Sequence, residues 1–197
     1  MDHSSLILTL PVWIEPFTKK YTFPLATVED RMGFVIALAL ENIKRKTGGP
    51  FAAGLFEAAT GSLIAAGVNR VVPLNCSIAH AEMMAIGLAQ QQLGTWNFGS
   101  GDQPAVELVT STEPCAMCLG AIPWSGVGKV VCGATDADAR AAGFDEGAKP
   151  DNWTKVLERQ GISVVTGVCA EEAAAVFSVY KEAGGVIYNG RSAESPY

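Results

Sequence analysis

The chain has 197 residues, of which 49% are hydrophobic, and a formal net charge of −6 at pH 7. This length and composition predict one globular domain with a sizeable core and exclude a chain that is disordered throughout. The acidic balance disfavours nucleic acid as a partner, because such partners usually require a basic surface. No apolar run is long enough to cross a bilayer, and the N-terminus lacks a secretory signal, so we expect a cytoplasmic protein with no membrane partner.

The first segment of the chain, residues 1–26, contains three prolines and shows no regular hydrophobic period. Proline fixes φ and removes a backbone donor, so this segment predicts an irregular leader that packs on the body of the protein. Thr27 and Asp30 then form a capping-box pattern, which indicates that a helix begins here. We expect residues 27–197 to form a single domain.

Beyond the leader, helical and strand patterns follow one another in a recognisable order. A helix precedes a β-hairpin, and helices and strands then alternate, which predicts an α/β fold. The expected architecture is a three-layer α/β/α arrangement, with helices on both faces of a five-stranded mixed sheet. The predicted helices cover residues 27–46, 79–93, 115–125, 136–142, 154–159 and 170–182, and the predicted strands cover residues 51–56, 63–69, 106–111, 129–133 and 162–166.

Two short motifs carry metal-binding chemistry. His80 begins one predicted helix, and Cys115 and Cys118 begin another, three residues apart and therefore on one helical turn. Three such ligands leave a tetrahedral zinc with an open position, where a catalytic water binds. Glu82 is two residues from His80, so the two side chains do not share a helix face. We expect Glu82 to project over the open position and to move protons between water and substrate.

A structural zinc site and a redox Cys-x-x-Cys motif are the two alternatives to this interpretation. A structural site requires a fourth ligand, and the remaining cysteines, Cys76, Cys132 and Cys169, have no ligand spacing to either motif. The redox interpretation leaves His80 and Glu82 without a role. The odd number of cysteines also argues against a disulfide framework. The pattern therefore favours catalytic zinc.

With these motifs the chain resembles the cytidine deaminase superfamily, whose pattern is His-x-Glu followed by Pro-Cys-x-x-Cys. Four further segments make it most similar to the bacterial guanine deaminases, over residues from about 29 to the end. These are Gly49-Pro50-Phe51-Ala52-Ala53, Asn69, Thr112-Glu113-Pro114-Cys115-Ala116-Met117-Cys118-Leu119-Gly120-Ala121-Ile122 and Gly143-Phe144-Asp145-Glu146. One departure is Glu146, where other members carry aspartate.

The resemblance implies a cytidine deaminase-like fold and a role for each matching position. It makes residues 27–197 a zinc-dependent deaminase domain, and it implies a homodimer because superfamily members commonly dimerise. Glu82 would be the proton shuttle and Glu146 a second catalytic carboxylate. The other implied roles are one zinc ion per chain on His80, Cys115 and Cys118, hydrogen bonds to the base from Asn69 and from the backbone N–H of Ala81, and walls for the ring formed by Phe51 and Trp124.

Two carboxylates suit guanine, whose reacting carbon lies between a bare ring nitrogen, a ring N–H and the amine. Glu82 can protonate the bare nitrogen, and Glu146 can accept from the N–H or from the departing amine. The expected reaction is hydrolysis of guanine to xanthine and ammonia, with a free purine as the small-molecule partner. The alternatives that stay open are an amino-triazine deaminase, a tRNA adenosine deaminase and a non-catalytic zinc-binding module.

Overall fold

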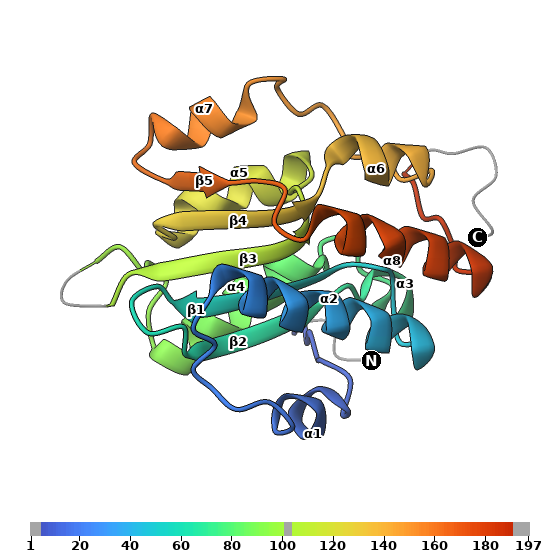
Figure 1. Ribbon diagram of the computed structural model, residues 1–197, viewed down its shortest axis with the longest axis horizontal. Helices are drawn as coiled ribbons and strands as arrows, with labels where there is room; N and C mark the ends of the chain where they lie inside the picture. Colours follow the sequence, from blue (N-terminus) through green and yellow to red (C-terminus); the bar gives the residue numbers. More distant parts are fainter. Residues whose placement is uncertain (1–4, 101–103, 191–197) are drawn as a thin grey trace.

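The computed structural model describes residues 5–100 and 104–190, and its centre is a five-stranded mixed sheet (Figure 1). The strand order is β2-β1-β3-β4-β5. β1 pairs antiparallel with β2 and β3, whereas β3, β4 and β5 are parallel. The predicted fold class is therefore confirmed. The strands are β1 (Ala52–Glu57), β2 (Leu63–Val68), β3 (Val106–Thr112), β4 (Lys129–Ala134) and β5 (Ser163–Val165).

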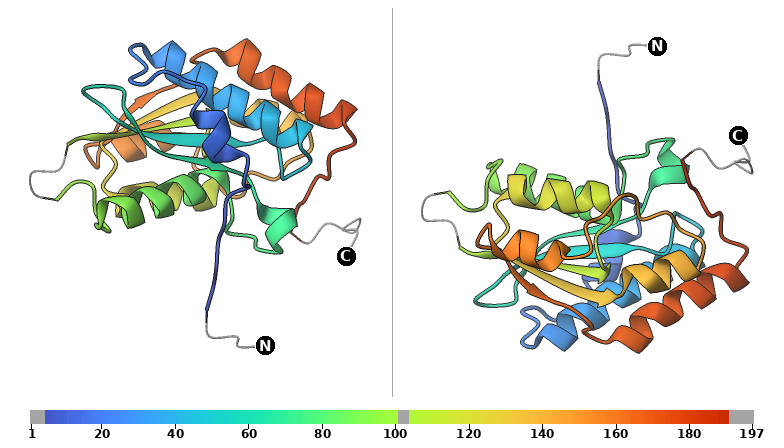
Figure 2. Two further views of the ribbon diagram at one scale, coloured as in Figure 1. Left: turned by 90° about the horizontal axis from the view of Figure 1, so that it is seen from below. Right: turned by 90° about the horizontal axis from the view of Figure 1, so that it is seen from above.

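Helices cover both faces of the sheet, as the two views in Figure 2 show. α2 (Val28–Lys44) and α8 (Ala170–Glu182) pack on one face, and α4 (Ala81–Leu93) and α5 (Ala116–Ser125) pack on the other. Each face encloses its own buried apolar cluster, because the strands of a sheet covered on both sides bury the side chains of both faces. The connection from β4 to β5 contains α6 (Asp136–Ala141) and α7 (Trp153–Glu158).

The start of α2 follows the capping-box pattern that the sequence predicts. The Thr27 hydroxyl accepts a hydrogen bond from the Asp30 amide at 3.1 Å, and the Asp30 carboxylate accepts one from the Thr27 amide at 3.2 Å. Each bond satisfies a donor that has no acceptor within the helix. The helix accordingly begins at Val28, directly after its cap.

The leader is more regular than expected. It contains a five-residue helix, α1 (Ile14–Thr18), so the prediction of an irregular segment is wrong over that stretch. Trp13 and Ile14 are 5% and 6% exposed and enter the core beneath α2, and the Trp13 indole N–H donates to the Thr47 hydroxyl at 2.9 Å. A second short helix, α3 (Val71–Leu74), was also not predicted. The placement of a domain boundary after residue 26 stays a prediction.

The edge of the sheet where the parallel strands end is the place where helix N-termini gather. β3 ends at Thr112, and the chain enters α5 at Ala116 after three residues. β4 ends at Ala134 and leads directly into α6. Ligand sites in open α/β sheets form beyond the carboxyl ends of the strands, so this edge is the expected location of the site. No helix within residues 5–100 and 104–190 is long and apolar enough to cross a membrane.

Candidate metal centre and active site

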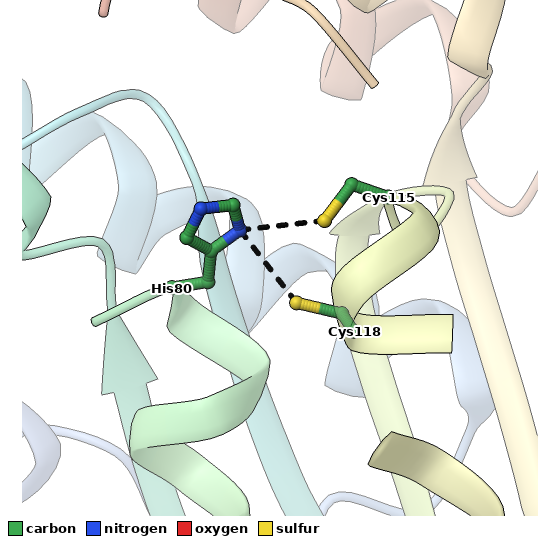
Figure 3. A group of neighbouring side chains, drawn as sticks. All are labelled: His80, Cys115 and Cys118. Carbon is green, nitrogen blue, oxygen red and sulfur yellow. Dashed lines mark hydrogen bonds between the residues drawn. The ribbon is translucent and has the colours of Figure 1, made fainter. Parts of the chain in front are cut away.

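Three ligand atoms from two helix N-termini lie together at this edge (Figure 3). His80 is the N-cap of α4, Cys115 is the N-cap of α5, and Cys118 lies in the first turn of α5. His80 Nδ1 is 3.5 Å from Cys115 Sγ and 3.6 Å from Cys118 Sγ. All three ligand atoms lie within 4.8 Å of one another. The structure therefore assembles the three residues that the sequence motifs nominate.

The spacing of these atoms fits a zinc ion. With Zn–N of about 2.0–2.1 Å and Zn–S of about 2.3 Å, a tetrahedral centre separates its nitrogen and sulfur ligands by roughly 3.6 Å. The observed nitrogen–sulfur distances of 3.5 and 3.6 Å match that edge length. In the described ranges, this group of potential metal ligands contains only His80, Cys115 and Cys118. A donor set of one imidazole and two thiols is typical of zinc and leaves the fourth position open.

The two thiols differ in acidity. Hydrogen bonds from Cys118 and His80 lower the pKa of the Cys115 thiol to about 4. The hydrogen bond that Cys118 makes to Cys115, together with burial, raises the pKa of the Cys118 thiol. The surroundings of Cys115 therefore favour its thiolate form. Cys115 also lies at the N-terminus of α5, where the helix dipole stabilises negative charge. A divalent cation binds thiolates, so this preformed charge favours metal binding.

Removing one of these sulfurs is expected to remove the metal. In Cys118→Ala we expect zinc per chain to fall from about one toward zero, because two ligands hold the ion far more weakly than three. Elemental analysis of the purified variant measures this. Cys132→Ala is the matched control, since Cys132 is also fully buried but lies on β4 outside the ligand group. Full zinc content in Cys118→Ala would rule out the assigned ligand set.

A cavity of about 340 Å³ opens beside the ligand atoms. This volume is at the small end of the range of about 300–1,000 Å³ that is usual for ligand pockets. Its walls contain most of the residues that the sequence nominates for binding and catalysis. These are Phe51, Asn69, His80, Glu82, Cys115 and Glu146.

Glu82 lies in the first turn of α4 with its side chain buried, since the residue is only 7% exposed. Burial raises the pKa of this carboxyl, and the negative charge of Cys115 acts in the same direction. Cys118 makes a hydrogen bond to the Glu82 side chain, so the carboxyl lies directly beside the ligand group. A carboxyl with a raised pKa next to the open position can both accept and return a proton.

Glu146 reaches the same cavity from the loop that follows α6. It is 5% exposed, and burial, followed by the charges of Cys115 and Glu82, raises its pKa to about 8. Its backbone carbonyl accepts a hydrogen bond from the Ala116 amide at 2.9 Å, which ties the loop to the start of α5. Gly147 has φ of +70°, a conformation that glycine adopts without strain, and the turn lies close against Ala116.

Asn69 directly follows β2 and is 1% exposed. Its side-chain oxygen accepts from the Val71 amide at 3.3 Å, and its side-chain NH₂ donates to the Tyr188 hydroxyl at 2.6 Å. The side-chain NH₂ of the buried Asn42 donates to the backbone carbonyl of Asn69 at 3.1 Å. The side chain is therefore held at its oxygen, while its donor end faces an aromatic residue of the cavity wall.

Phe51 lies in the cavity wall and packs edge-on against Phe144, with ring centroids 4.9 Å apart. Ala81 is the fully buried first residue of α4, so its amide is one of the N-terminal N–H groups that lack a helical acceptor. The prediction that Trp124 forms a wall for the ring is wrong for this cavity. Trp124 is 81% exposed and lines a separate groove beside α7, so it does not wall this cavity within its own chain.

Tyr188 and Glu113 lie in the cavity wall without a predicted role. Tyr188 contributes the hydroxyl that meets Asn69, 119 residues away along the chain. Glu113 precedes the cysteines and accepts a hydrogen bond from the Asp136 amide at 3.1 Å. Glu113 could have been found from its position inside the Thr-Glu-Pro-Cys motif. The sequence around Tyr188 contains no motif that predicts a place in the site. Residues 188–190 line the cavity, and the rest of the C-terminal tail, 191–197, lies outside the described residues.

The chain belongs to the family of cytidine and deoxycytidylate deaminases. Residues 27–134 match the family model described as the cytidine and deoxycytidylate deaminase zinc-binding region. This match, together with the ligand group and its carboxylate, defines a zinc-dependent aminohydrolase. The resemblance and the cofactor predicted from the motifs are thereby confirmed.

Within this family the chain is most usefully compared with guanine deaminases. It is 40% identical over 111 residues to guanine deaminase of Bacillus subtilis (strain 168), covering 56% of this chain and 67% of that protein. A solved structure of guanine deaminase from Nitrosomonas europaea is 47% identical, covers 90% of this chain and 97% of that one, and superposes with a TM-score of 0.86. A solved structure in complex with 2,6-diaminopurine is 48% identical, covers 95% of this chain and 98% of that one, and gives a TM-score of 0.87.

Proposed function

We propose that this protein hydrolyses guanine, as a free base, to xanthine and ammonia. The observation that carries the proposal is the presence of two buried carboxyls, Glu82 and Glu146, in one cavity beside the ligand group. Guanine needs one group that protonates its bare ring nitrogen and one that accepts from its ring N–H or its amine. The similarity to guanine deaminases of two bacteria supports the same substrate.

The charge and size of the cavity support a free base over a nucleotide. Among the described residues that line it are four acids, Glu82, Glu113, Asp145 and Glu146, and no lysine or arginine. A phosphate would meet these acidic side chains without a compensating cation. The volume of about 340 Å³ is also suited to a single heterocycle.

Each residue has a defined part in this reaction. His80, Cys115 and Cys118 would hold the zinc ion, which when bound would supply the Lewis acid that activates water near neutral pH. Glu82 would carry one proton from the attacking water to the bare ring nitrogen and a second, from the hydroxyl then formed on the ring carbon, to the leaving amine, since its buried carboxyl lies beside the ligands. Asn69 donates to the base from its NH₂ group after that group leaves the Tyr188 hydroxyl. Glu146 accepts from the ring N–H.

Ammonia release from guanine by the zinc-containing protein tests the proposal directly. We expect turnover of guanine, with loss of guanine and gain of xanthine followed by ultraviolet absorbance. A panel with cytidine, adenine, an amino-triazine and tRNA is run in parallel. If ammonia were released only from the amino-triazine, or only from tRNA, guanine would be rejected as the substrate. Hydrolytic deamination would still be the reaction type.

A tRNA adenosine deaminase is the rival within the family. The chain is 34% identical over 124 residues to the tRNA-specific adenosine deaminase of Bacillus subtilis (strain 168), covering 61% of this chain and 69% of that protein. Such an enzyme must bind a polyanion, which conflicts with a net charge of −6 and with an acidic cavity wall. A gel-shift with tRNA at moderate salt is expected to show no complex.

We further propose that the protein forms a homodimer through the face covered by α4 and α5. Trp124 on α5 is 81% exposed and lines a largely apolar groove between α5 and α7, and Met117 at the start of α5 is 36% exposed. In both views of Figure 2 the segment before α1 runs past this same helical layer, and its Leu6 and Ile7 are 68% and 73% exposed. An exposed apolar face with an apolar arm beside it is suited to a second copy of the chain.

Light scattering on the purified protein measures this association. We expect a dimer for the unmodified chain and a monomer for Trp124→Glu, which places a charge at the centre of the contact without disturbing any buried residue. Val179→Glu, which places a charge at an exposed apolar position of α8 on the opposite face of the sheet, is the control that should stay dimeric. A monomeric unmodified chain would reject the proposal.

A further inference from the structure

Lys149 is a buried cation next to the candidate active site that has no part in the proposed reaction. Its side chain is only 6% exposed. The ammonium lies 3.4 Å from Glu113 Oε2, 3.0 Å from Asp136 Oδ1 and 5.2 Å from the centre of the Trp153 ring. Burying an ammonium is costly unless it is paired, so this arrangement of two carboxylates and an aromatic face holds the lysine in one place.

The two carboxylate partners of Lys149 lie on separate elements, and one of them, Glu113, lines the cavity. Glu113 stands between β3 and the cysteines at the start of α5, and Asp136 is the first residue of α6. Lys149 itself ends the segment 143–149, which carries Glu146. One ammonium therefore connects the metal-binding helix, the end of β4 and the Glu146 loop.

The carboxylate of Glu146 depends on this loop for its position. Among residues 5–100 and 104–190, no group donates a hydrogen bond to its side chain; the loop is held instead through its backbone. The Ala116 amide donates to the Glu146 carbonyl at 2.9 Å, and Arg140 Nη2 donates to the Gly147 carbonyl at 2.9 Å. Beyond Gly147, the next anchor on the loop is the side chain of Lys149.

Resting on the proposed function, we infer that Lys149 is a positioning residue that fixes the Glu146 loop against the metal-binding helix and so directs the Glu146 carboxylate at the substrate. A misplacement of about 1 Å in a reacting group can reduce the rate roughly 10²-fold.

The test compares Lys149→Met and Lys149→Arg with a matched lysine elsewhere. Lys129 also pairs with a buried carboxylate, Glu107 Oε2 at 2.6 Å, but it lies at the opposite end of β4, roughly 16 Å from the site at about 3.3 Å per residue. Lys129→Met therefore loses a comparable ion pair without touching the Glu146 loop. Zinc content and thermal stability are measured for all three variants.

The expected kinetic result is a fall in kcat of about 10–10²-fold in Lys149→Met, with KM little changed and about one zinc per chain. Lys149→Arg keeps a cation and should recover most of the loss, and Lys129→Met should keep the kcat of the unmodified protein. When Glu146→Gln is already present, adding Lys149→Met should cause little further loss, because both changes act through one carboxylate. The inference would be overturned if the kcat losses of Lys149→Met and Glu146→Gln were fully additive. It would also be overturned if Lys129→Met lost as much kcat as Lys149→Met.

Amide hydrogen exchange gives a reading that does not depend on the substrate. In the zinc-containing protein without ligand, Lys149→Met is expected to increase exchange across residues 143–149, and Lys129→Met is expected to leave it unchanged. Unchanged exchange in Lys149→Met would contradict the anchoring role even if guanine proved to be the substrate. Increased exchange combined with no turnover of guanine by the unmodified protein would instead reject the proposed function and retain the anchor.

Discussion

Glu82→Gln is expected to reduce the kcat of guanine deamination by about 10²–10⁴-fold, the range that a positioned acid or base contributes. Glutamine has nearly the same shape as glutamate but cannot carry a proton between water and the ring. The fold should not suffer, because burial already raises the pKa of Glu82 and a neutral group is well accommodated at this position. Steady-state ammonia release gives kcat and KM, and elemental analysis gives the zinc content.

Two results decide this prediction together. The zinc content should stay at about one per chain, since Glu82 does not belong to the ligand group. Glu171→Gln, a change at an exposed position on α8, is the control that should keep the kcat of the unmodified protein. Undiminished turnover in Glu82→Gln would require another proton carrier, and loss of zinc would mean that the carboxylate supports the metal. A non-catalytic zinc-binding module predicts no guanine turnover even before the substitution.

Most of the fold could be predicted because apolar periodicity and stop signals agree along the chain. The capping box at Thr27 and the left-handed Gly94 and Gly126 mark where helices begin and end. α1 and α3 were missed because each is short and contains a proline, Pro16 or Pro73. Helices this short are stabilised by packing rather than by propensity, and no local pattern reports that packing.

The metal ligands could be predicted because zinc chemistry restricts both residue type and spacing. The prediction for Trp124 was wrong for a geometric reason. It lies nine residues after Cys115, or about two and a half helical turns, and therefore faces away from the ligands. Tyr188 and Lys149 could not be predicted, because their roles depend on contacts with residues far away along the chain. Asn69 is 119 positions from Tyr188, and Glu113 is 36 positions from Lys149.

Glu146→Gln is expected to reduce kcat/KM for guanine by about 10²–10³-fold, comparable to the loss of one preorganised polar group that stabilises a transition state. The Glu146 carboxylate accepts a hydrogen bond from the ring N–H. The glutamine side chain can instead turn its NH₂ group toward the ring N–H, which places two donors against each other. A buried polar group left without a partner adds to the loss. Because Glu146 does not belong to the ligand group and its loop is held through backbone carbonyls, zinc content and thermal stability should change little.

Glu146→Asp separates charge from reach. It keeps the carboxylate but withdraws it by one methylene, so we expect an activity between that of the unmodified protein and that of Glu146→Gln. Glu158→Gln, at an exposed position of α7, controls for the loss of a surface charge and should leave kcat/KM unchanged. If Glu146→Gln retained full activity, Glu146 would have no part in catalysis. The preference for guanine over a ring that has a bare nitrogen but no ring N–H beside the reacting carbon would then have to come from Asn69 alone. Equal activity in Glu146→Asp and the unmodified protein would instead show that the loop adjusts to the shorter side chain, which conflicts with a loop held at Ala116, Arg140 and Lys149.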